Sequence, residues 1–225
     1  MTDTAAPPSS WPDLCRPSTW FFSKTVVLTI VAILLIAPTA ARARALGDSG
    51  VAYSADRALR VNGQRFDGVL YATPGFQRHE QIMSGISQVA IFDLAAGRGY
   101  YIVPSVRTYI DFPIDIAVRE LGMPDVLAAP VGTERQGGVV TTKYRVDHRT
   151  SDGAQVVGFV WLAASGIPMR GEGAVIEANG KRTPVTWTLS NVHVAPQDPG
   201  LFQPPQGFYR LPAAALPGIL GGAGN

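Results

Sequence analysis

The chain has 225 residues, of which 46% are hydrophobic and 16% are charged, and its formal net charge at pH 7 is +2. This length suits one domain with a core of its own, together with an export segment. The scattered charges argue against a nucleic-acid partner, because binding to phosphates depends on clustered basic side chains.

The first 45 residues have the order of a secretory signal peptide. Lys24 precedes an apolar run of thirteen residues (25–37), Pro38 ends the run, and Ala43-Arg44-Ala45 supplies the small residues of a cleavage site. We expect cleavage after Ala45 and an exported protein. The alternative is an uncleaved segment that anchors the protein in the inner membrane, although a spanning helix needs roughly 20 apolar residues.

Removal of this segment changes the cysteine content and the charge. The single cysteine, Cys15, lies within it, so the remaining domain has no thiol for a disulfide or a thiolate site. Four basic and two acidic residues are removed as well, which leaves 15 of each sign and a net charge of zero. The domain must therefore be held together by its core.

From residue 53 onward, short segments alternate apolar and polar residues between turns. Asn62-Gly63 and Asn179-Gly180 are typical of hairpins, and Pro74-Gly75 marks another turn. We expect an antiparallel meander of about ten strands, followed by a loose tail at 213–225. The expected strands span residues 53–61, 64–72, 76–83, 88–94, 100–103, 107–112, 139–148, 155–162, 167–178 and 182–194.

One helix is expected between the sixth and seventh strands. Residues 114–121 place apolar side chains at 114, 117, 118 and 121 on one helical face, and Gly122 follows. Residues 123–131 contain two prolines and are expected to form a short helical turn or a lid-like loop. The fold class is therefore mainly β, of the α+β kind, with a curved antiparallel sheet that wraps around a helix.

Two strands carry apolar residues on both faces, at 100–103 and 156–162. Such a strand is either buried on both sides or lines an apolar cavity on one side, and both interpretations stay open. Arg57 and Arg78 lie on apolar faces of their strands. We expect them at a rim or edge, because an unpaired buried charge costs several kcal/mol. Arg78 has Glu80 two residues on as a partner.

The catalytic and metal-binding motifs are incomplete. His79-Glu80 begins like a zinc-protease helix, but Met83 stands where the second histidine belongs, and His148 and His193 are far away in the sequence. The string Gly47-Asp48-Ser49-Gly50 copies the surroundings of a serine nucleophile without the required histidine and acid before it. The sequence contains no nucleophile elbow, phosphate-cradling loop or dinucleotide fingerprint. We expect no enzyme, no metal and no cofactor.

Several segments together resemble the LolA/LolB-like superfamily of periplasmic proteins, most closely its uncharacterised members. The resemblance is carried by Gly68–Glu80, Tyr101–Tyr109, Val131–Val146, Trp161–Arg170 and Asn191–Pro205. It covers most of Tyr53 to Pro212, within an expected domain of residues 46–212. It implies an unclosed half β-barrel with a short helical lid or plug. It further implies a periplasmic protein that holds acyl chains in the hollow of the half barrel. Unlike the carriers of this superfamily, the chain enters a strand directly after its export segment.

This resemblance implies a hydrophobic cavity and its ligand. The expected partners are the acyl chains of a lipid or lipoprotein and a membrane-anchored envelope protein, and nucleic acid is not among them. The alternative is a structural or sensory envelope protein with a packed interior. The expected wall residues are Phe66, Leu70, Ile91, Tyr101, Val103, Ile110, Phe112, Phe159, Trp161, Trp187 and Leu189, with Arg57 and Arg78 as polar contacts.

Overall fold

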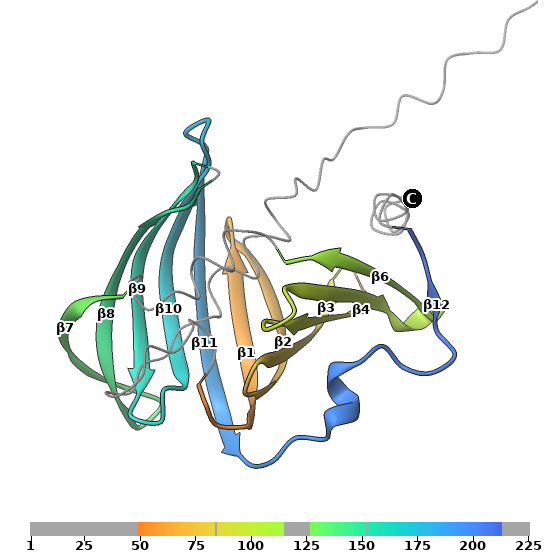
Figure 1. Cartoon of the computed structure of the whole chain (residues 1–225). Helices are drawn as coiled ribbons and strands as arrows, with labels where there is room; N and C mark the ends of the chain where they lie inside the picture. Colours follow the sequence, from red (N-terminus) through yellow and green to blue (C-terminus); the bar gives the residue numbers. More distant parts are fainter. Residues whose placement is uncertain (1–48, 84, 115–126, 152, 213–225) are drawn as a thin grey trace, which may run out of the picture.

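The computed structural model describes residues 49–83, 85–114, 127–151 and 153–212, and in these ranges twelve strands form one sheet (Figure 1). The order β12-β6-β5-β4-β3-β2-β1-β11-β10-β9-β8-β7 is linear, so the sheet is not closed into a barrel. The strands are β1 (Tyr53–Val61), β2 (Gln64–Thr73), β3 (Phe76–Met83), β4 (Ile86–Asp93), β5 (Arg98–Val103), β6 (Thr108–Pro113), β7 (Leu127–Gln136), β8 (Val139–Arg149), β9 (Gln155–Ala163), β10 (Pro168–Ile176), β11 (Arg182–Val194) and β12 (Tyr209–Arg210).

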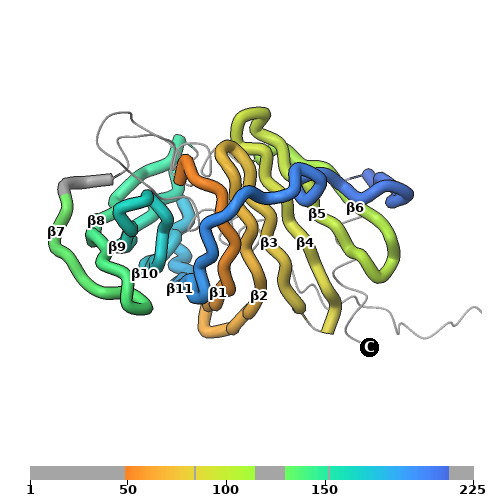
Figure 2. Tube along the Cα trace, turned by 90° about the horizontal axis from the view of Figure 1, so that it is seen from below, coloured from red at the N-terminus to blue at the C-terminus, as the bar shows by residue number. Residues whose placement is uncertain are grey.

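Two antiparallel meanders make up this sheet, β1 to β6 and β7 to β11. They are joined by the pairing of β1 with β11, from Tyr53 opposite Val194 to Val61 opposite Val185. The consecutive strands β6 and β7 consequently lie on opposite sides of the molecule (Figure 2). The short strand β12 adds to β6 in the parallel direction, which departs from the expected all-antiparallel sheet.

Turn chemistry sets the register of the first hairpin. Asn62 and Gly63 have φ angles of 49° and 83°, and a two-residue turn with both angles positive matches the twist of the flanking strands. Gly63 adopts this backbone without steric cost, and Asn62 is among the few other residues that tolerate it. The turn places Val61 opposite Gln64, and this first pair determines the register of all the other cross-strand pairs of β1 and β2.

All ten expected strands are present with small shifts at their ends, but two further strands were missed. Residues 123–131 were expected to be a helical turn or a loop, and this was wrong from Leu127 onward, where β7 begins. Pro130 and Gly132 are tolerated because β7 is an edge strand, with register shifts on both sides of Pro130. Of the expected helix 114–121, only Ile114 lies within the described residues, and it is buried.

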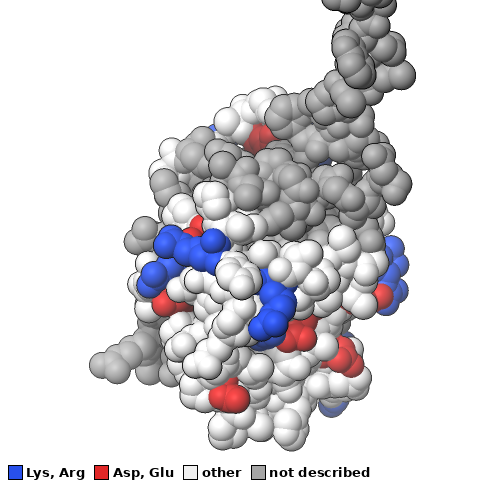
Figure 3. Space-filling view, turned by 90° about the vertical axis from the view of Figure 1, so that its right-hand side faces the viewer, with Lys and Arg blue, Asp and Glu red and all other residues white. Residues whose placement is uncertain are grey.

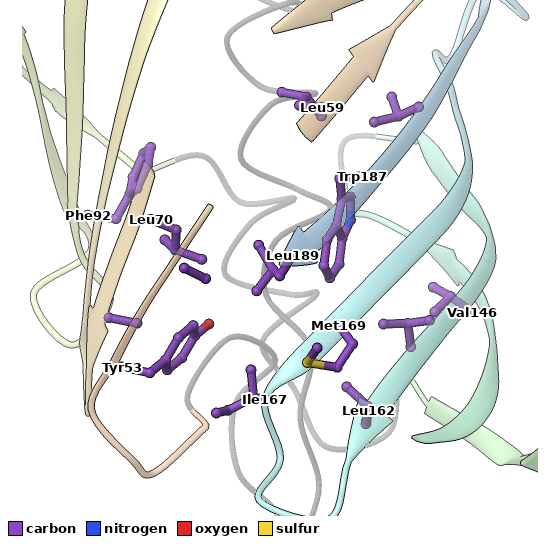
Figure 4. Close-up of a cluster of buried hydrophobic side chains, with 14 of the residues drawn as sticks. Tyr53, Leu59, Leu70, Phe92, Val146, Leu162, Ile167, Met169, Trp187 and Leu189 are labelled. Atoms are coloured by element: carbon purple, nitrogen blue, oxygen red, sulfur yellow. The ribbon is translucent and has the colours of Figure 1, made fainter. Parts of the chain in front are cut away.

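The side chains of β1, and of β11 from Arg182 to Ser190, alternate strictly, with buried residues on one face of the sheet and mostly exposed residues on the other. We call the first the inner face, because the sheet curves so that this face of both halves is turned inward (Figure 4). Leu59 and Leu70 from one half and Val160 and Trp187 from the other are fully or almost fully buried in the same cluster. The indole of Trp187 lies against Gly171 on β10, where any side chain would collide with it.

The outer face carries a second, smaller cluster on β4 and β5. Val89, Ile91 and Ile102 pack there with Phe202, which comes from a 3-10 turn, η3 (Pro199–Phe202). The Asp198 side chain accepts a hydrogen bond from the Gly200 amide and thereby caps this turn. Outer-face burial on this half of the sheet is therefore achieved by the segment that follows β11.

Helices within the described ranges are too short, or not apolar enough, to cross a lipid bilayer. The expected signal peptide at 1–45 and the expected tail at 213–225 lie outside the described residues.

Packing of the inner face predicts a large loss of stability when a side chain there is shortened. Leu70 has no exposed surface, so Leu70→Ala should lower the free energy of unfolding by about 2–5 kcal/mol. Ile82 on the adjacent strand is 67% exposed, and Ile82→Ala should change the same quantity by less than about 0.5 kcal/mol. Urea denaturation followed by circular dichroism measures both, and equal losses would contradict the assignment of the inner face.

Candidate functional site

A group of polar side chains interrupts the apolar inner face near its centre. Arg57 on β1, Gly68 on β2 and Gln81 on β3 are successive cross-strand partners, so they share this face. Because Gly68 has no side chain, the guanidinium of Arg57 extends across β2 to the third strand. Its Nη2 donates to Gln81 Oε1 at 2.7 Å, and its Nη1 donates to His79 Nδ1 at 2.9 Å.

These contacts define the protonation of His79. A guanidinium can only donate, so Nδ1 of His79 must accept, and the proton of the neutral ring resides on Nε2. Nε2 lies 3.0 Å from Gln77 Oε1, to which it donates. Burial and, second, the positive charge of Arg57 hold the pKa of His79 well below its ordinary value of 6.5. The imidazole is therefore neutral across the physiological pH range.

Arg57 does not lie at a rim or edge, and that expectation was wrong. Its exposed fraction is 1%, because β1 is an interior strand with β2 and β11 as neighbours. Burial lowers the pKa of Arg57 to about 10, which still leaves the guanidinium charged at neutral pH. Among the described residues, the two side chains that form hydrogen bonds with it, His79 and Gln81, are both uncharged.

Other buried polar atoms occur on the same face. Arg57 Nε, Gln88 Oε1, Tyr101 Oη and Trp187 Nε1 have no hydrogen-bond partner among the described residues. Gln88 is the cross-strand partner of Gln81, and Tyr101 follows His79 and Ala90 along one row of the sheet. Burial raises the pKa of the Tyr101 hydroxyl, so it stays protonated and can donate. The inner face thus combines an apolar surface with polar groups whose hydrogen-bonding capacity is not used.

The structure brings most of the expected wall residues onto this inner face. Val103 alternates with Tyr101 and is placed on the same side at the end of β5. Register and core packing place the following expected residues on the inner face: Phe66, Leu70, Tyr101, Ile110, Phe112, Trp187, Leu189 and Arg57.

Four expected site residues lie on the outer face instead: Ile91, Phe159, Trp161 and Arg78. Ile91 belongs to the outer cluster, and Phe159 and Trp161 are cross-strand partners of Arg145 and Lys143. The indole of Trp161 is covered by Lys143 and Arg170, each at 4.6 Å from the ring centre, and its Nε1 donates to Glu134. These residues are therefore separated by the sheet from the rest of the expected wall.

Arg78 attaches the segment after β11 to the outer face. The expected pairing with Glu80 is confirmed, with Nε at 2.7 Å from Glu80 Oε1, and Nη1 donates to the carbonyl oxygen of Leu201 at 2.9 Å. The residue is thus part of the packing of η3 and lies apart from the inner-face polar group.

His79, Gln81 and Gln88, which lie with Arg57 among the polar side chains of the inner face, were not expected there from the sequence. A signal was available, because Gln77, His79 and Gln81 alternate with period two within one expected strand. From the sequence alone, these three polar residues could equally well form the solvent-facing side of the strand. Only the register with β2 shows that they share the face of Leu70 and Arg57.

Two other features of the described residues do not form a comparable site. A depression of about 310 Å³ is lined by residues 96–98 and 111–113, but its Asp111 is bound by Arg210 through two hydrogen bonds of 2.7 Å. No group of three or more His, Cys, Asp or Glu side chains in the described ranges could hold a metal ion. On the face seen in Figure 3, described basic and acidic side chains are interspersed. The inner face is thus the best candidate for a functional site.

The chain matches no known protein-family profile and no curated protein. Similar solved structures include an uncharacterised conserved protein from Thermus thermophilus, with 14% identity, 72% of this chain and 91% of that chain covered, and a TM-score of 0.49. The complex of MucA and MucB from Pseudomonas aeruginosa is also similar, with 13% identity, 68% of this chain and 55% of that chain covered, and a TM-score of 0.41.

A LolA superfamily protein from Nitrosomonas europaea is also similar, with 8% identity, coverage of 68% and 90%, and a TM-score of 0.38. At these identities and TM-scores, the similarity carries over neither a ligand nor a partner of these proteins to this chain.

His79 predicts a pH dependence of stability. Below pH 6.5 the unfolded chain binds a proton at this histidine that the folded chain does not, so stability falls as the pH falls. Between pH 7.5 and 5.5 the loss through His79 should reach at most about 1.4 kcal/mol, the limit for a histidine that stays neutral in the folded chain and titrates normally in the unfolded chain. His79→Asn keeps an acceptor near the position of Nδ1 and should abolish this part of the loss. Denaturation at both pH values measures it, and His193→Asn at an exposed position is the control. The same pH dependence in His79→Asn and wild type would contradict the assignment.

Proposed function

We propose that this protein is a non-catalytic periplasmic binding protein that holds the acyl chains of a lipid or lipoprotein against its inner face. The proposal is supported by one observation above all. The described strands form a single unclosed sheet, and apolar side chains from both of its halves line the same interior. An acyl chain is the ligand whose chemistry matches such a surface, because each buried methylene contributes about 0.8 kcal/mol.

The burial of the inner face adds a condition to this proposal. Leu59 and Leu70 have no exposed surface, so a ligand does not gain affinity simply by covering them. An acyl chain must instead displace existing contacts or separate the two halves of the sheet. An unclosed sheet can widen in this way more easily than a barrel, whose strands are paired all round. Binding is therefore coupled to a structural change, and part of the burial energy offsets its cost.

The two tryptophans of the strand region allow a direct test, because they lie on opposite faces. Trp187 is on the inner face and Trp161 on the outer face. In a chain carrying Trp11→Phe, Trp20→Phe and Trp161→Phe, a brominated fatty acid should quench the emission of Trp187. With Trp187→Phe in place of Trp161→Phe, the emission of Trp161 should stay unchanged. Bromine quenches indoles only at short range, so this pair of variants reports the face at which the acyl chain binds.

Native mass spectrometry of the protein purified from the periplasm is the second measurement. Co-purifying lipid is expected. A protein that is free of lipid and whose Trp187 emission is insensitive to brominated chains would overturn the proposal.

A free sheet edge supports a second candidate function, the binding of an envelope protein. Among the described strands, β7 pairs with β8 on one side and ends the sheet on the other. Val131 and Val140, on β7 and β8, are 55% and 54% exposed. An edge strand with exposed apolar side chains can accept a strand from another protein.

Site-specific crosslinking in cells tests this second candidate. A photocrosslinking residue at Val131, which is exposed on the edge strand β7, should capture an envelope protein. The same residue at Val194, which is 58% exposed on the interior strand β11, should not capture it. Equal capture at both positions, or none, would argue against the edge as an interface.

A further inference from the structure

We propose that Arg57, held in place by its hydrogen bonds to His79 and Gln81, binds the anionic head group of the amphiphile whose acyl chain lies on the inner face. The inference rests on the proposed function and extends it, because it names the charge of the ligand and the residue that recognises it. The ligand class is an acyl chain that ends in a carboxylate or a phosphate.

The first support is the position of Arg57. It lies on an interior strand, is 1% exposed, and is flanked along its strand by Ala55 and Leu59 on the same apolar face. A charge costs several kcal/mol in such surroundings unless it is paired. A packing role would be filled at lower cost by Leu or Met, so the guanidinium calls for a partner of opposite charge.

The second support is the contrast with other arginines. Each of Arg65, Arg78, Arg145, Arg170 and Arg210 is largely or partly exposed and forms an ion pair with Asp or Glu. Arg57 is more deeply buried than any of these, yet the groups it contacts among the described residues are His79 and Gln81. Neutral acceptors take two of its five N–H groups. Within the described ranges, the most deeply buried cation of this group thus lacks a counter-ion.

The third support is the unused donor capacity at the same place. Arg57 Nε is buried without a hydrogen-bond partner in the described part of the chain, and the same holds for the hydroxyl of Tyr101 on this face. A guanidinium binds carboxylate or phosphate oxygens through two parallel N–H groups. The neutral His79 and the amides of Gln81 and Gln88 add no negative charge that would repel the anion. The inner face therefore provides an anion-binding group within an apolar surface, which matches an amphiphile with an anionic end.

Displacement of a fluorescent fatty-acid probe from the wild-type chain tests this inference. Palmitate should bind at least tenfold more tightly than hexadecanol, which has the same chain length and a neutral end. Arg57→Met should remove that difference and retain binding of hexadecanol. Arg60→Met, which removes an exposed arginine from the same strand, should keep the difference. Acetate and inorganic phosphate distinguish a lipid head group from a free anion, because neither should displace the probe at the concentrations at which palmitate does.

The outcomes separate this inference from the proposed function. Equal affinity of the wild type for palmitate and hexadecanol would overturn the anion site and leave acyl binding intact. This comparison needs no variant, so it decides even if Arg57→Met does not fold. If neither amphiphile binds, the proposed function fails. Calorimetry with inorganic phosphate then decides on the anion site. Binding heat that the wild type shows and Arg57→Met lacks would retain an anion site that needs no acyl chain. If the wild type shows no binding heat, the anion site is overturned together with the proposed function.

Discussion

The pairing of β1 with β11 is the interaction on which the rest of this structure depends. Within each of the two meanders, the pairing is between strands that follow one another in the chain. Only the β1–β11 ladder joins them into one sheet and turns the same face of both halves inward. It also places Leu59 opposite Trp187 and Arg57 opposite Leu189, so the centre of the inner face is made of residues more than a hundred positions apart.

This ladder explains why a charged residue is buried here. In a separate N-terminal meander, β1 would be an edge strand, and Arg57 could extend into solvent as a rim residue does. Once β11 covers that edge, the guanidinium has to find its partners within the face. It extends over Gly68 to His79 and Gln81, which satisfy hydrogen bonds without neutralising the charge. An anionic ligand would neutralise the charge of the guanidinium, which these neutral acceptors do not.

Apolar side chains are covered in different ways on the two faces of the sheet. The inner face buries apolar side chains of the two halves against each other. The outer face uses local devices, such as η3 over β4 and β5, and Lys143 with Arg170 around Trp161. Aliphatic stems of charged residues can cover an aromatic ring while their heads stay in water. A large buried aromatic residue on a strand is therefore no proof that the strand lines an interior.

The sequence by itself determined the strands and most of their turns, because period-two alternation and turns such as Asn62-Gly63 act over a few residues. It also indicated which side of β1 and β11 is apolar. It missed β7, since Pro130 is unfavourable in a strand unless the strand is an edge, and edges are defined only by the whole sheet. The faces of Ile91, Phe159 and Trp161, and the burial of Arg57, were decided by the tertiary structure. The physical reason is that the identity of a strand's neighbours and cover arises from pairings distant in the chain, which no local pattern records.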